Sequence, residues 1–150
     1  EFDIEKNWVL FSNNENKLSC VYCWYPLIIG NIQFNKFFTT NTINTPLFFK
    51  NIRCSSNGVS INDEVWFLCH YVSYENRRHY YHCFIIIDKY SYEVKNYTCL
   101  FTFEKKPVEY SLGFIFHKDN IIIGYSIIDS TTQFKKVSIN KIQELFLLNR

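Results

Sequence analysis

Three segments of the chain repeat one pattern: a short polar stretch, a strand, a tight polar turn, and a second, longer apolar strand. The second strands are expected to begin at Lys17, Glu64 and Asn120, which lie 47 and 56 residues apart. A period near 50 residues with about four strands per unit is typical of β-propellers. We therefore expect residues 1–150 to form a single all-β domain, a partial β-propeller of about three four-stranded blades. A β-sandwich, which needs no repeat, is the alternative.

Short runs rich in Val, Ile, Tyr, Phe and Trp, separated by Asn, Asp, Lys and Gly, are typical of strands. The predicted strands are residues 8–12, 17–24, 27–32, 65–72, 80–88, 108–117 and 120–128. One helix is predicted at the C-terminal end, from Lys141 to Leu148, with Asn140 as its N-cap. Its apolar residues Ile142, Leu145 and Phe146 fall on one face.

Composition narrows the kinds of partner. Hydrophobic residues make up 47% of the chain and aromatic residues 19%, which supports a packed core rather than disorder. The net charge of +2 does not favour nucleic acid or a membrane surface. Apolar runs are too short to cross a bilayer, and the first residues do not resemble a secretory signal. We expect a cytoplasmic protein, in the host cytoplasm if it is viral.

The sequence holds six cysteines, of which Cys20 and Cys23 form a C-x-x-C pair, but no second pair has zinc-ligand spacing, so we expect free thiols in the core and no metal. Alanine and methionine are absent, while residues with AT-rich codons abound. An AT-rich genome explains this composition. The missing methionine suggests that the chain is trimmed or cut from something longer, and three blades alone would leave open sheet edges. We therefore expect missing blades or pairing with a second copy.

The repeat also predicts a site. In a propeller, ligand sites usually lie at one end of the central channel. Equivalent strand ends that carry different polar residues in the three repeats indicate a site at that end. The alternative is that these positions are ordinary strand ends entering loops. The two sets of positions that the alignment makes equivalent are Cys23, His70 and Ser126, and then Pro26, Ser73 and Asp129.

Several motifs, in this order, resemble a known family. They are Glu5–Trp8 followed by Lys17–Tyr22, then Trp66–Ser73 with Arg78–His82 and Ile85–Asp88, and finally Val108–Gly113 with Gly124-Tyr125 and Asp129. Together they resemble the five-bladed propellers related to the β-mannoside phosphorylases, glycoside hydrolase family 130. The pattern is most similar to the propellers attached to, or encoded beside, glycosyltransferases in bacteria and large DNA viruses. The resemblance spans residues 5–129.

The resemblance implies a sugar site at the propeller axis. It places Lys6 and His70 as ligands of phosphate or another anion, Tyr80 or Tyr81 as a hydroxyl donor, and Asp129 as a carboxylate that binds sugar hydroxyls. Inorganic phosphate would be the co-substrate of a phosphorylase, and no other cofactor is expected. The N-terminal blades that carry the family's catalytic aspartate have no counterpart here. A glycine expected near Cys54 is also missing.

Two further candidates follow from the residues themselves. Glu109 lies within an otherwise apolar strand, and a buried carboxylate needs a partner, for which Lys6 or Arg53 would be natural. Arg78 and its neighbour Arg77 lie in a predicted hairpin turn, where they are either solvated or contact a sugar phosphate. The predicted substrate-binding set is Lys6, Arg53, His70, Tyr80, Tyr81, Glu109 and Asp129.

These observations favour a module that binds a carbohydrate or sugar phosphate and is not catalytic alone, linked to the synthesis or processing of glycans. One alternative is a glycoside phosphorylase or hydrolase that acts on β-mannosides once further blades complete it. Cleavage with inversion needs an acid on one side of the bond and an activated nucleophile on the other, and Asp129 cannot supply both. The second alternative is a propeller that binds a protein partner.

Overall fold

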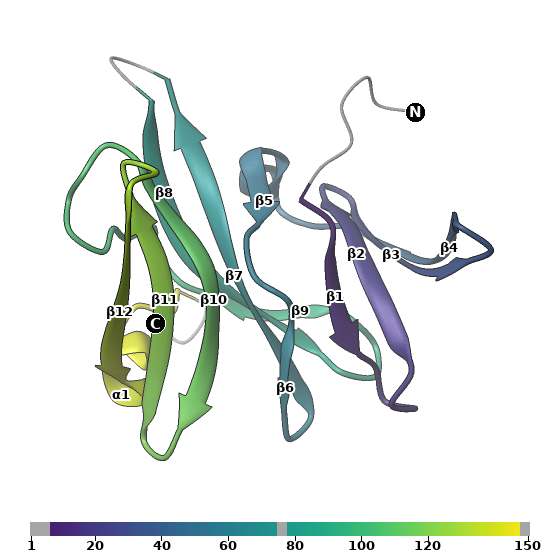
Figure 1. Ribbon diagram of the computed structural model, residues 1–150. Coiled ribbons are helices and arrows are strands. Elements are labelled where there is room, and N and C mark those ends of the chain that lie inside the picture. The colour runs from purple at the N-terminus through teal and green to yellow at the C-terminus, as the bar shows by residue number, and fades with distance from the viewer. Residues whose placement is uncertain (1–6, 75–77, 148–150) are drawn as a thin grey trace.

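The computed structural model describes residues 7–74 and 78–147, which form three antiparallel sheets and one short α-helix. The first sheet is a meander of β1 (Val9–Ser12), β2 (Leu18–Trp24), β3 (Leu27–Gln33) and β4 (Lys36–Ile43), paired in chain order (Figure 1). Phe34 and Asn35 join β3 to β4 with φ angles of 48° and 59°. Two consecutive positive φ angles match the twist of a tight hairpin, and asparagine adopts them readily.

The middle sheet has an interrupted first strand. Both β5 (Ile52–Cys54) and β6 (Val59–Ile61) pair with β7 (Glu64–Ser73). On its other edge β7 pairs with β8 (His79–Asp88), and β8 pairs with β9 (Val94–Tyr97). Ser56 bridges the interruption, because its amide donates to the Leu68 carbonyl and its hydroxyl accepts from the Leu68 amide. A 3₁₀ helix, η1 (Leu47–Asn51), leads directly into β5.

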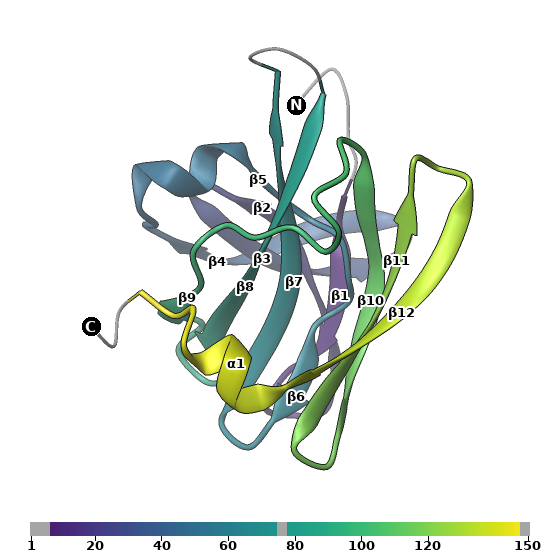
Figure 2. The ribbon, with the colours of Figure 1, turned by 90° about the vertical axis from the view of Figure 1, so that its left-hand side faces the viewer.

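The third sheet consists of β10 (Glu109–His117), β11 (Asn120–Ile127) and β12 (Thr131–Ser138). The helix α1 (Ile139–Gln143) follows β12 at once, as Figure 2 shows. Its N-cap is Ser138, whose hydroxyl accepts a hydrogen bond from the Lys141 amide. No helix among the described residues is long and apolar enough to cross a membrane.

The middle sheet is buried on both faces, between the first and third sheets (Figure 1). Side chains alternate along β7: Phe67 joins the core shared with the first sheet, and its neighbours Trp66 and Leu68 join the core shared with the third. In the first core, Trp24 packs edge-on against Phe67, with their ring centroids 5.4 Å apart. In the second, Phe146 packs edge-on against Trp66.

The all-β class with a C-terminal helix is confirmed. The second strand of each sheet begins at Leu18, Glu64 and Asn120, within one residue of the predicted starts. The prediction of four strands in every blade was not met, because the described part of the third sheet has three strands and the middle sheet has five. No strand among the described residues closes the three sheets into a ring.

The helix prediction was wrong in its bounds. The helix spans Ile139–Gln143 rather than 141–148, and its cap is Ser138 rather than Asn140. All six cysteines are unpaired, and four of them are buried.

Candidate binding site on the middle sheet

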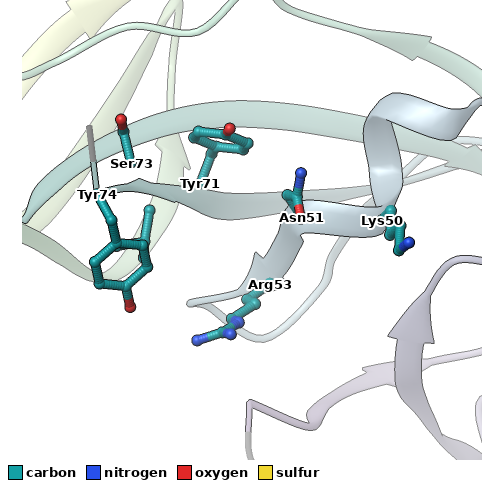
Figure 3. A pocket seen from close by; sticks show the side chains of 7 residues that line it. Lys50, Asn51, Arg53, Tyr71, Ser73 and Tyr74 are labelled. Atoms are coloured by element: carbon teal, nitrogen blue, oxygen red, sulfur yellow. The ribbon is translucent and has the colours of Figure 1, made fainter.

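A surface pocket of about 420 Å³ lies where the end of β7 passes the start of β5. The end of β7 and the strand β5, which border the pocket, both lie in the upper half of Figure 1. Figure 3 shows its lining, which consists of Lys50, Asn51, Arg53, Tyr71, Val72, Ser73 and Tyr74.

The pocket exists because the two strands differ in length. β5 pairs with β7 only as far as Ile52, opposite Tyr71, and the chain before Ile52 turns away as η1. β7 continues to Ser73 and is paired there with β8 alone. The space that a longer β5 would fill is the pocket.

The side chains around the pocket combine rings, hydrogen-bonding groups and positive charge. In Figure 3, Tyr71 and Ser73 lie on one side of β7, while Arg53 and Tyr74 lie on the other. Tyr74 is exposed to 69%. A tyrosine ring offers an apolar face together with a polar hydroxyl, which suits ligands that have both.

Next to Arg53, between the middle and third sheets, lies a cluster that consists of His70, Ser55, Tyr80 and Tyr110; we call it the His70 cluster. His70 is opposite Arg53 in the β5–β7 register, and it is buried. A hydrogen bond of 2.7 Å joins its Nδ1 to the Ser55 hydroxyl. Its ring centroid lies 5.5 Å from that of Tyr80 and 5.4 Å from that of Tyr110. These contacts hold the histidine in place beside the strand that carries Arg53.

Arg78 covers the outer end of the His70 cluster. Its guanidinium lies 4.9 Å from the centre of the Tyr80 ring and donates a hydrogen bond to the Tyr80 hydroxyl. A cation over an aromatic face is attracted by the ring's quadrupole. The Tyr80 hydroxyl is therefore already engaged within the protein.

The partners of the Glu109 carboxylate are backbone amides rather than a basic side chain. Its fully buried carboxylate accepts hydrogen bonds from the backbone amides of Phe103 at 2.5 Å, Glu104 at 2.8 Å and Lys106 at 2.7 Å. The expectation that the buried carboxylate has a partner is met by these hydrogen bonds, but Arg53 is not that partner, because among the described residues no ion pair includes Glu109. The carboxylate instead organises the loop that precedes β10.

His82 lies deeper on the same face of the sheet, opposite His70 in the β7–β8 register. Its ring stacks on Phe103 with centroids 4.3 Å apart. Neither ring nitrogen has a hydrogen-bond partner among the described residues. Burial, with a smaller contribution from His70, lowers the pKa of His82 to about 3, so the ring is neutral.

The predicted site residues separate into groups. Arg53 lines the pocket, and His70 and Tyr80 lie behind it. Tyr81 lies on the opposite face of the middle sheet, beside Tyr71 in the register. Asp129 is exposed in the turn between β11 and β12, with a φ of 52°.

Asp129 is not among the described residues that line the pocket, and no ion pair of the described residues includes it. Lys6 lies outside the described residues, so the convergence of Lys6, His70 and Asp129 stays a prediction. Sequence reasoning missed Lys50, Asn51 and Tyr74 as lining residues. The only signal for them is their position next to Arg53 and Ser73.

The fold and the pocket define an all-β protein of packed antiparallel sheets with a cationic, tyrosine-bearing pocket on its middle sheet. Comparison with known proteins finds no protein-family model that matches the chain and no similar curated protein.

Proposed function

We propose that the chain is a carbohydrate-recognition module and that its three sheets are consecutive blades of a β-propeller. Two features support the architecture. The first and third described sheets are antiparallel meanders in chain order, the middle sheet differs only in that β5 and β6 both pair with β7, and each sheet packs face to face on the next. Completing a ring would require further sheets, from a longer chain or a second copy.

The pocket carries the proposal of sugar recognition. A sugar ring has an apolar face and a rim of hydroxyls, so its sites combine an aromatic ring with polar side chains. Tyr71 and Tyr74 supply the rings, and Asn51 and Ser73 supply hydrogen-bonding groups. The 69% exposure of Tyr74 leaves most of its ring available for stacking.

The lining favours binding over catalysis. Glycoside cleavage normally requires a pair of carboxyl groups flanking the bond. No aspartate or glutamate is among the described residues that line the pocket. The alternative of a β-mannoside phosphorylase would need carboxylates from further blades.

A glycan array tests the proposal with wild type, Tyr74→Ala and the matched control Tyr90→Ala. Tyr90 is also exposed, at 61%, but lies in the turn between β8 and β9. Losing one stacked ring should weaken glycan binding about tenfold in Tyr74→Ala and leave Tyr90→Ala unchanged. No glycan binding by wild type, or equal binding by the two variants, would contradict sugar recognition in this pocket.

A second assay separates binding from turnover. Release of mannose from β-mannosides that depends on added phosphate would support the phosphorylase, and loss of that release in Asp129→Asn would place the exposed carboxylate in its site. Binding without release supports the recognition module.

A further inference from the structure

We infer that the sugar bound in this pocket carries an anionic group, a phosphate ester or a carboxylate, and that Arg53 binds this group while Lys50 adds positive charge nearby. The inference rests on the proposed function and extends it from sugars in general to charged ones.

The charge of the pocket is one-sided. The described residues that line it include two cations, Lys50 and Arg53, and no carboxylate. The chain as a whole has 16 basic and 14 acidic residues, so a lining with two cations and no carboxylate among its described residues differs from the average composition.

The ion pairs of the described residues use other lysines. They join Lys17 to Glu15, Lys95 to Glu64 and Lys135 to Glu104. Neither Lys50 nor Arg53 takes part in them, so both can offer their charge to a ligand. In Figure 3 the charged ends of Lys50 and Arg53 point in different directions, so an anionic group takes its charge-assisted hydrogen bonds from Arg53, and Lys50 adds positive charge nearby.

The backbone that carries the two cations is firmly anchored. Phe49 is fully buried and Ile52 is 5% exposed, and both pack into the core shared with the first sheet. Lys50 and Asn51 lie between these anchors, and Arg53 follows in β5. An anchored segment loses little further conformational entropy when a ligand binds to it.

The arrangement also orients the ligand. Arg53 and the Tyr74 ring lie on the same side of β7 (Figure 3). The planar guanidinium can bind two oxygens of a phosphate or carboxylate at once, whereas a lysine acts as a point charge. The anionic group therefore binds at Arg53, and the sugar ring lies against Tyr74.

The experiment compares each sugar in neutral, phosphorylated and uronate form on one array, with inorganic phosphate as a soluble competitor. The variants are Arg53→Gln, Lys50→Gln and the control Lys36→Gln, which changes an exposed lysine in β4. Circular dichroism and the midpoint of urea unfolding verify that each variant folds.

Wild type should bind a charged form at least about tenfold more tightly than the neutral one, because hydrogen bonds to charged groups are the stronger ones. Arg53→Gln should lose that preference, Lys50→Gln should reduce it, and Lys36→Gln should keep it. The form preferred, phosphorylated or uronate, identifies the anionic group.

The possible failures are distinguishable. Equal binding of neutral and charged forms, unaffected by Arg53→Gln but weakened by Tyr74→Ala, would overturn the anion inference and leave sugar recognition intact. Inorganic phosphate that competes as well as a phosphorylated sugar would support the anion site and refute sugar recognition. Binding to none of the probes would refute both.

Discussion

Acidification should destabilise the fold through one residue, His82. Its ring is buried between the middle and third sheets, stacked on Phe103, with neither nitrogen hydrogen-bonded among the described residues. Burial lowers its pKa from 6.5 to about 3, with His70 adding to the effect and the Glu109 backbone opposing it. The His82 side chain therefore takes up a proton near pH 6.5 in the unfolded chain but only near pH 3 in the folded chain.

The size of the effect follows from proton linkage. Stability from this group is fully present above pH 6.5 and is lost as the pH falls toward 3, because the unfolded state binds the extra proton. Each pKa unit is worth about 1.36 kcal/mol. At pH 4.5, two units below 6.5, the loss from His82 is about 2.7 kcal/mol, a large part of the stability of a typical domain.

Urea unfolding monitored by tryptophan fluorescence at pH 7.5 and pH 4.5 measures this loss. In His82→Leu, which has no titrating ring, the free energy of unfolding should fall by about 2–3 kcal/mol less than in wild type. The control His117→Leu removes an exposed histidine and should follow wild type. Parallel curves for wild type and His82→Leu would refute the assignment of a neutral, buried His82.

Two further predictions concern the scaffold. Gly30→Ala should destabilise the protein by about 1–3 kcal/mol, because the added Cβ would overlap the Phe38 carbonyl, whereas Gly113→Ala meets nothing within 4 Å and should be neutral or stabilising; urea unfolding compares the two. Glu109→Gln should cost about 3 kcal/mol, since the carboxylate accepts three amide hydrogen bonds, and should speed proteolysis of residues 103–106, while the exposed Glu93→Gln should do neither. Equal unfolding midpoints within either pair would contradict these assignments.

The strands that sequence reasoning predicted are those with a strong apolar pattern. β7 and β8 are apolar on both faces, and each was predicted within one residue of its bounds. β4 and β12 were missed because most of their residues are exposed and polar. β5 and β6, of three residues each, are too short for any period to be visible.

The helix was predicted too long because tertiary contacts end it. The apolar spacing of Leu145 and Phe146 continues the helical pattern. In the structure the Leu145 carbonyl instead accepts from the Cys99 amide, and Phe146 forms a β-bridge with Thr98. Such long-range pairings leave no trace in local periodicity.

The site was predictable only in part. Arg53, a residue of the predicted set, lines the pocket, and the register places His70 beside it. The pocket that includes Lys50 and Tyr74 depends on where β5 ends relative to β7, which the sequence does not reveal. The backbone amides that donate to Glu109 could not be predicted either, because almost every residue has a backbone amide. Only the conformation of the loop directs three of these amides toward the one carboxylate.

Because the middle sheet is buried on both faces, β7 and β8 contribute side chains to both hydrophobic cores. A residue enlarged at Phe67 presses on the first sheet, and one enlarged at Leu68, a single position away, presses on the third. A change in either core therefore acts on the same two strands. If the middle sheet unfolds, the hydrophobic faces of both outer sheets become exposed, so we expect the three sheets to unfold cooperatively.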